Sequence, residues 1–335
     1  MAEHLTAAII GLGWWGRQIV ESLERSTLIE VVRAVEPNLT AAQAFARTHG
    51  LTLTDTMDKA LDDHTIDAVM IATPHRLHEE QVVAAAGFGK HVFCEKPLAL
   101  TAEAARRMVA ACHDRGLVLG IGHERRFEGA LQEAARMAAS GELGTLLHIE
   151  CNWSHNLFMG ATTSGWRQDP EQAPAGTLTA LGVHITDYFQ SVAGPMESVR
   201  AIMTHRSAQF PADDVITCQF RFANEMTGMM TNLATTPFYQ RIAIFGDEGW
   251  VEIVETTNVD VPEPAVLTWR GMDQEIHTRT FRHADTVRAN LEEWAAAALG
   301  AASYRFTDAQ LIHNVEILEA IVRSTQTGTA ETVGG

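Results

Sequence analysis

Short, continuously apolar runs alternate with amphipathic segments through the first third of the chain. Each run is followed by a stretch of helical composition, and turn-forming residues separate the two. Such runs predict parallel strands covered by helices on both faces, because both sides of each strand are apolar. The predicted strands are residues 7–10, 30–36, 67–72, 90–95 and 117–121, and the predicted helices are 17–25, 40–49 with Thr40 as N-cap, 77–86 and 101–115.

The pattern changes after about residue 122. A helix at 129–140 is followed by apolar segments at hairpin-like spacing, which predict a mostly antiparallel sheet. We therefore predict an α/β domain at 1–122 and an α+β domain with a large open sheet at 123–335, whose C-terminal helices could pack back on the first. The predicted strands are 145–153, 199–203, 214–222, 226–233, 240–245, 250–254 and 265–269, the closing helices are 286–299 and 308–325, and a loose tail starts at 327.

Three spaced glycines follow the first predicted strand and open the first helix. Gly11 permits a tight turn, Gly13 leaves the backbone bare for a diphosphate, and Gly16 lets the helix pack closely on the strand. The helix N-terminus adds unpaired N–H groups and a partial positive charge. Trp14 and Trp15 stand between the second and third glycines. The spacing in this context predicts dinucleotide binding.

An acidic residue, Glu36, ends the second predicted strand. A carboxylate there accepts hydrogen bonds from the ribose hydroxyls of NAD and repels the 2′-phosphate of NADP. A solvated loop acid is the alternative interpretation. Arg33, which precedes the strand end, offers no obvious phosphate clamp. We therefore predict NAD as the cofactor, with NADP less favoured.

Two further motifs carry groups suited to proton transfer. Lys96 directly follows a buried-type strand, so it is expected at the carboxyl end of the sheet, and Pro97 fixes the chain direction, with a cis bond as one option. A partly buried ammonium has a lowered pKa, which suits proton exchange. His184 and Asp187 lie three residues apart, on one face of a predicted helix. A surface turn and a structural histidine are the alternatives.

Composition narrows the class of protein. The net charge of −17 argues against nucleic acid and anionic membrane partners but leaves a small-molecule substrate open. Four widely spaced cysteines fit free thiols rather than a disulfide or zinc framework, so we expect no metal. No signal peptide or membrane span is evident, and we expect a cytoplasmic protein.

Together these segments resemble the Gfo/Idh/MocA oxidoreductases, which include glucose–fructose oxidoreductases and inositol dehydrogenases. The resemblance rests on residues 11–16, 72–75, His78, 89–97 and 182–187 and covers nearly the whole chain. It implies an N-terminal Rossmann domain, a C-terminal domain on a large open sheet, and a nicotinamide cofactor. It also implies a homodimer or homotetramer.

The resemblance assigns roles to individual residues. Lys96 and His184 would be the catalytic pair that flanks the reacting carbon. Cofactor contacts are implied for Gly11, Gly13, Trp14, Trp15, Gly16, Glu36, Thr73, Pro74, His75, His78, Glu95 and Lys96, and substrate contacts for Lys96, Arg126, Trp166, Arg167, Thr177, His184 and Asp187.

One departure concerns the acid–base chemistry. Ala180 stands where sugar-oxidising members carry an aspartate, so proton transfer falls to Lys96 or His184, with Thr177 or Thr179 as hydrogen-bonding substitutes. We predict an NAD-dependent enzyme that moves hydride between the nicotinamide and a hydroxyl or carbonyl carbon of a sugar, polyol, inositol or related molecule. The alternatives are an NAD-retaining glycosidase or lyase that uses transient oxidation, and a non-catalytic NAD-binding regulator.

Overall fold

The computed structural model describes residues 3–156, 173–176, 178–208, 210, 213–256, 261 and 263–335. The chain divides into two compact units. Unit 1 comprises Met1–Glu124 and Asp285–Ile312, and unit 2 comprises Arg125–Ala284 and His313–Gly335. None of the helices in the described ranges is long and apolar enough to cross a membrane.

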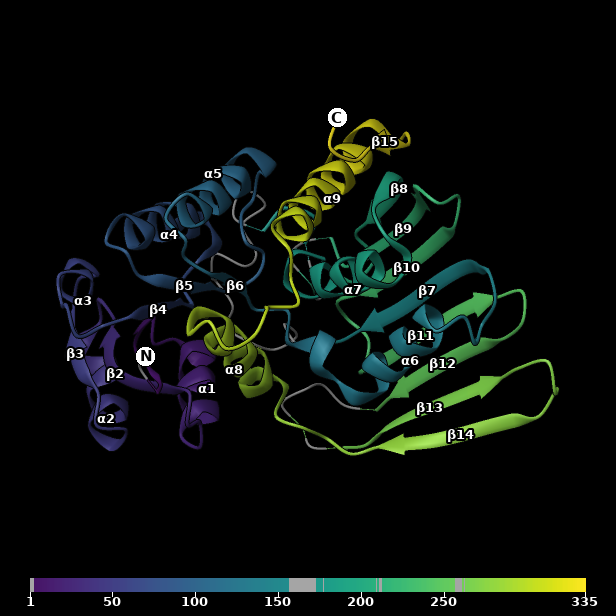
Figure 1. The fold of residues 1–335 in the computed structure, drawn as a ribbon. Helices are drawn as coiled ribbons and strands as arrows, with labels where there is room; N and C mark the ends of the chain where they lie inside the picture. The colour runs from purple at the N-terminus through teal and green to yellow at the C-terminus, as the bar shows by residue number, and fades with distance from the viewer. Residues whose placement is uncertain are drawn as a thin grey trace. The chain divides into compact units, whose positions relative to one another are not determined.

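Unit 1 is built on a parallel sheet of six strands among the described residues, in the order β3-β2-β1-β4-β5-β6 (Figure 1). The order reverses between β1 and β4, and open α/β sheets bind ligands outside the carboxyl ends of strands at such a switch point. The strands are β1 (Leu5–Ile10), β2 (Ile29–Val35), β3 (Thr52–Thr54), β4 (Ala68–Ile71), β5 (His91–Cys94) and β6 (Leu119–Ile121).

Helices cover both faces of this sheet. α1 and α8 pack together on one face, and α4 and α5 pack together on the other (Figure 1). The fully buried side chains of Ile9, Ile19 and Trp294 join β1, α1 and α8 in one core. The helices are α1 (Trp14–Leu23), α2 (Leu39–Thr48), α3 (Asp58–Leu61), α4 (His78–Gly87), α5 (Ala102–His113) and α8 (Thr286–Ala298).

Two predicted helix starts in unit 1 are wrong. α1 begins three residues earlier than predicted, because the extended Gly13 is its N-cap and the helix starts directly after it. α2 is capped by Asn38, whose Oδ1 accepts a hydrogen bond from the Ala41 N–H at 3.2 Å, rather than by Thr40. The short elements β3 and α3 were not predicted.

Unit 2 is built on a sheet of nine strands within the described ranges, in the order β14-β13-β12-β11-β7-β10-β9-β8-β15. Only the central β7–β10 pair of these is parallel. The strands are β7 (Leu146–Ser154), β8 (Met196–Thr204), β9 (Val215–Phe222), β10 (Thr227–Leu233), β11 (Tyr239–Gly246), β12 (Trp250–Glu255), β13 (Ala265–Arg270), β14 (Ile276–Phe281) and β15 (Glu331–Thr332).

The helices of unit 2 are α6 (Gly129–Ala139), α7 (Val183–Ala193) and, from His313 on, α9 (Asp308–Thr327), and they lie on one face of the sheet (Figure 1). Leu131, Phe189 and Ile321 from these helices join one buried core with the inward side chains of the strands. A parallel sheet unit followed by a mostly antiparallel one confirms the predicted fold class. The prediction of a loose tail from residue 327 is wrong, because Glu331 in β15 pairs with Val199 of β8.

Candidate active site

Two glycines of the turn between β1 and α1, Gly11 and Gly16, leave no room for a side chain. Gly11 has φ +92°, and a Cβ on it would lie 2.7 Å from the backbone oxygen of Ala72. A Cβ on Gly16 would overlap the backbone oxygen of Gly11. The bare backbone therefore lets β1, α1 and the end of β4 meet closely, which is the arrangement a dinucleotide site requires.

The start of α1 is open. Gly13 is extended, and a Cβ there would meet nothing within 4 Å. Trp14 is 57% exposed and its ring centroid lies 5.4 Å from that of the half-buried Trp15. An uncrowded helix N-terminus with free N–H groups suits a diphosphate.

Glu36 follows β2 and lies directly beside the glycine turn. Its Oε2 accepts a hydrogen bond from the Leu12 N–H at 3.1 Å, and its Oε1 accepts one from the Asn38 N–H at 3.0 Å. Arg33, by contrast, is paired with Asp63 at 2.6 Å. The turn thus carries a fixed carboxylate of the kind that binds ribose hydroxyls, so these residues fit an NAD-type cofactor.

The segment after β4 lies at the same edge of the sheet. The Thr73 hydroxyl donates to Gln81 Oε1 at 2.6 Å. Pro74 then leads into a 3-10 turn at His75–Leu77, in which His75 is 9% exposed. Thr73, Pro74 and His75 therefore lie just beyond the carboxyl end of β4, and their contact with a cofactor stays a prediction.

His78 lies inside the fold. Its side chain is fully buried, with Nε2 3.0 Å from Thr73 O and Nδ1 3.0 Å from Pro97 O and 3.3 Å from Leu98 O. Burial lowers the pKa of His78, against the opposing effect of these carbonyls. The ring joins the segment after β4 to the segment after β5. A fully enclosed ring has no surface for a cofactor, so the geometry supports an indirect role.

Lys96 is half-buried at the carboxyl end of β5, and the Lys96–Pro97 peptide bond is cis. The chain has three lysines. Lys59 is exposed and paired with Asp55 at 2.6 Å, while Lys90 is buried and donates to the carbonyls of Asp63 and Ile66. Lys96 is therefore the lysine at the edge of the sheet that carries the glycine turn.

Glu95, the residue before Lys96, lies close to a second carboxylate, Glu124. Both side chains are buried, at 7% exposed for Glu95 and 4% for Glu124. A Cβ on Gly122 would overlap the Glu95 carboxyl group. The pKa of Glu95 is raised to about 7, chiefly because burial removes water from the carboxylate and then because Glu124 is negative; Lys96 and the nearby Trp15 act in the opposite direction.

The residues predicted in unit 2 form their own cluster. Arg126 donates from Nε and Nη2 to the two carboxylate oxygens of Asp187, at 2.6 Å each. His184, one turn earlier on α7, is buried with its ring 5.9 Å from that of Trp153. The guanidinium carbon of Arg125 lies over the same Trp153 ring, 4.0 Å from its centroid. Contact of these residues with a substrate stays a prediction.

Three predicted substrate residues, Trp166, Arg167 and Thr177, lie outside the described residues. Ala180 lies in a π-helical turn at Leu178–Gly182, directly before α7. The Thr179 hydroxyl donates to the carbonyl of Pro174.

Two charged residues at this edge of unit 1 were not predicted. Glu124 lies three residues after the end of β6, and Lys96 lies two residues after the end of β5. The argument that places Lys96 at the carboxyl edge of the sheet could therefore also have identified Glu124. Arg17 lies in the first turns of α1, where its Nε donates to Leu12 O at 3.1 Å and its Nη2 to Ala41 O at 3.0 Å. No sequence signal beyond its place after Gly16 singles it out.

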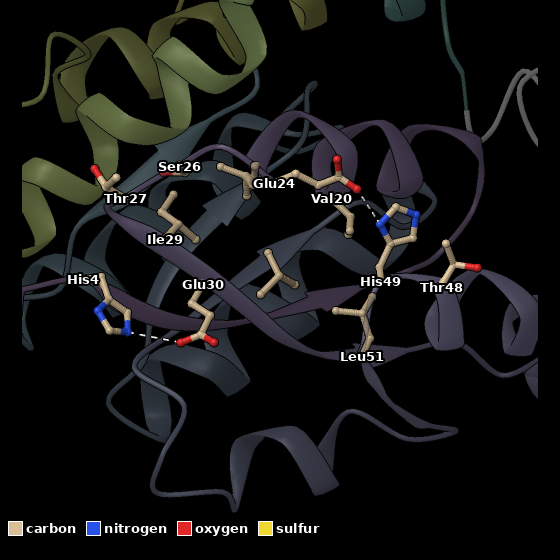
Figure 2. Close-up of a pocket in the computed structure, with 12 residues that line it drawn as sticks. His4, Val20, Glu24, Ser26, Thr27, Ile29, Glu30, Thr48, His49 and Leu51 are labelled. Atoms are coloured by element: carbon tan, nitrogen blue, oxygen red, sulfur yellow. Dashed lines mark ion pairs between the residues drawn. The ribbon is translucent and has the colours of Figure 1, made fainter.

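A hollow of about 680 Å³ lies elsewhere in unit 1 (Figure 2). Its wall carries two ion pairs, His4–Glu30 at 3.3 Å and His49–Glu24 at 2.9 Å. His4 and Glu30 stand at the amino ends of β1 and β2, the edge opposite the glycine turn. The hollow includes none of the predicted site residues.

Comparison with known proteins identifies the family of both parts of the chain. Residues 5–123 match a model described as "Oxidoreductase family, NAD-binding Rossmann fold", and residues 131–252 match the "GFO/IDH/MocA C-terminal domain". The chain is 30% identical over 245 residues to 1,5-anhydro-D-fructose reductase of Ensifer adhaerens, covering 72% of this chain and 73% of that protein.

Two more similarities cover most of the chain. D-xylose 1-dehydrogenase (NADP(+)) 2 of Haloferax volcanii is 29% identical over 270 residues, or 81% of each chain. Levoglucosan dehydrogenase in complex with NADH superposes with a TM-score of 0.86 at 22% identity, over 98% of this chain and 99% of that one. The matched models extend over well more than half of the 335 residues. The chain therefore belongs to the Gfo/Idh/MocA family and is an oxidoreductase with an NAD-binding Rossmann fold.

Proposed function

We propose that the chain transfers hydride reversibly between NAD(H) and a hydroxyl or carbonyl carbon of a sugar, polyol or related small molecule. The observation that carries this proposal is Lys96 at the carboxyl edge of the sheet that also bears the glycine turn and Glu36. The printed names of the relatives, a 1,5-anhydro-D-fructose reductase and a D-xylose 1-dehydrogenase, support a sugar-like substrate.

Different residues of unit 1 would bind different parts of the cofactor. The bare turn at Gly11–Gly16 and the start of α1 would receive the diphosphate, and Glu36 would accept the ribose hydroxyls. When bound, NAD supplies the hydride-accepting ring, and the protein supplies binding and orientation. The fixed Glu36 carboxylate favours NAD over NADP, although one relative is named as NADP-dependent.

Lys96 is the proposed general acid and base. As the substrate is oxidised, its hydroxyl proton passes to the Lys96 amine; in reduction the Lys96 ammonium returns that proton to the carbonyl oxygen. The ionisable groups near this amine are two buried carboxyl groups, Glu95 and the negatively charged Glu124. His184 is the second proposed participant, because Ala180 cannot ionise.

The test is a screen of sugars, polyols and hydroxy acids with NAD and NADP, following the absorbance of the reduced nicotinamide. We expect NADH to form with at least one polyol or sugar. Changing Lys96 to Ala should lower turnover by about 10²–10⁴-fold and leave the Kd for NADH within a few-fold. The matched control is Lys59→Ala, an exposed lysine in the same unit, which should keep full turnover.

Two outcomes would contradict the proposal. Unchanged turnover in Lys96→Ala would remove its acid–base role. Purified protein that retains NAD tightly and turns over a glycoside with no net NADH release would favour a transient-oxidation glycosidase or lyase instead.

We further propose that the chain forms a homodimer or homotetramer through unit 2. The sheet face away from the helices exposes apolar side chains on β7, β8 and β10, namely Leu147, Ile202 and Met229. Light scattering after size-exclusion chromatography measures the mass, and a monomer at micromolar concentration would contradict this assignment.

A further inference from the structure

Arg17 lies beside the ribose corner of the cofactor site, and it has no acidic partner among the described residues. Its guanidinium donates to the backbone oxygens of Leu12 and Ala41 and lies 5.2 Å from the ring centroid of Phe45. Among the residues that the structure describes, no carboxylate lies within ion-pair distance of it. The two hydrogen bonds hold the positive charge in one place without neutralising it.

Glu36 is fixed on the same two segments. Its carboxylate accepts from the N–H of Leu12 on one side and from the N–H of Asn38 on the other, while Arg17 binds the Leu12 carbonyl and the Ala41 carbonyl. Both side chains therefore bridge the glycine turn and the start of α2. The corner where an adenosine ribose would lie carries one fixed charge of each sign.

We propose that Arg17 is a specificity-determining residue: a guanidinium placed to pair with a 2′-phosphate, and kept from doing so by the Glu36 carboxylate. This inference rests on the proposed cofactor site. A guanidinium binds phosphate through charge-assisted, often bidentate, hydrogen bonds, whereas the nearby carboxylate repels it. The preference for NAD over NADP then depends on Glu36 alone, since the cation that NADP needs is already present.

The test measures binding rather than turnover. Titration calorimetry with 5′-AMP and with adenosine 2′,5′-bisphosphate gives the ratio of the two Kd values for each variant. In Glu36→Gln, we expect this ratio to move toward the bisphosphate by at least about tenfold, because the repulsion is gone and Arg17 remains. In the double variant Glu36→Gln with Arg17→Met, most of that gain should disappear, and Arg17→Lys should keep part of it.

Arg47→Met is the matched control. Arg47 is exposed in the last turn of α2, the far end of that helix from Asn38, so its loss should leave the ratio of Kd values unchanged. Thermal melts check that each variant is folded.

Three results would overturn the inference. The first is a double variant that binds the bisphosphate as tightly as Glu36→Gln does. The second is a Glu36→Gln variant whose ratio of Kd values does not move toward the bisphosphate. The third is an Arg17→Met change, in the Glu36→Gln background, that weakens binding of both nucleotides equally, as expected if Arg17 has only a structural role. If hydride transfer fails while these shifts occur, only the proposed reaction is lost. If the unaltered protein binds neither nucleotide, the cofactor site itself is contradicted.

Discussion

The carboxylate of Asp187 is held by the guanidinium of Arg126 through two hydrogen bonds of 2.6 Å, and both side chains are buried. Asp187 lies one turn after His184 on α7, so the pair fixes the turn of helix that presents this histidine. Both carboxylate oxygens are thereby occupied. The geometry favours an orienting role for Asp187 over direct proton transfer.

Changing Asp187 to Asn should strongly destabilise unit 2. The buried Arg126 charge would lose the Asp187 carboxylate, and breaking a buried ion pair typically costs about 3–5 kcal/mol. Urea unfolding followed by fluorescence measures the loss. Glu225→Gln is the control, because its pair with Arg221 is exposed and should contribute less than about 1 kcal/mol. An Asp187→Asn protein as stable as the control variant would show that the buried pair does not hold α7.

Replacing His78 with Phe should loosen two segments at once. The larger apolar ring fills the space but removes the N–H that the imidazole donates to the carbonyls around it, and an unsatisfied buried carbonyl costs about 1–3 kcal/mol. Hydrogen exchange with mass spectrometry should show faster exchange in peptides covering the ends of β4 and β5. His78→Gln, which keeps a donor, should recover part of the protection.

Peptides from β2 provide the internal reference for that experiment, because His78 has no hydrogen bond to this strand. Equal exchange in the parent and the Phe variant at both segments would mean that the ring does not tie them together.

The stability of unit 1 should fall as pH rises through neutrality. The pKa of Glu95 is about 7 in the folded protein against an ordinary value of 4.5, so below pH 4.5 the group is neutral in both states and costs nothing. Between these values the unfolded chain releases the proton and the folded chain keeps it. Above about pH 7 the folded state bears the buried charge, a loss of roughly 3 kcal/mol.

Unfolding free energies at intervals from pH 4 to pH 8 test this dependence. Glu95→Gln should flatten it, since the amide cannot ionise. Glu124→Gln should move the transition to lower pH, because the neighbouring negative charge raises the pKa of Glu95. A parent protein and a Glu95→Gln variant with the same pH dependence would contradict the assignment.

Local signals explain which parts of the fold could be predicted. The predicted strands of unit 1 are mostly apolar runs, and the glycine turn is bounded by a strand and a helix, so the local sequence is enough to predict them. β3 and β14 were missed because Thr52–Thr54 and Ile276–Phe281 are short or exposed edge strands without a buried alternation. β15 is two residues long and depends on β8, more than a hundred residues earlier.

The site was predicted less completely, for a related reason. Lys96 and Glu36 stand at strand ends, where topology alone places them at the ligand-binding edge. The partners of Arg17, by contrast, are backbone oxygens in the glycine turn and in the first turn of α2, which no residue pattern specifies. His78 has a recognisable motif, but its burial depends on the segment after β5, so the resemblance suggested a cofactor contact where the structure encloses the ring.

Because the chain has three lysines in distinct surroundings, amine modification can locate the cofactor beside Lys96. Under limited acetylation, Lys59 should react quickly because it is exposed, and Lys90 slowly because its ammonium is buried against two carbonyls. Lys96 is half-buried, so we expect an intermediate rate that falls at least about tenfold with saturating NADH, as the bound ring covers the amine. Mass spectrometry of the peptides measures all three rates in one sample, and Lys59 serves as the internal control for reagent loss. If NADH binds yet the rate at Lys96 stays unchanged, this lysine does not face the cofactor and its proposed part in proton transfer fails with it.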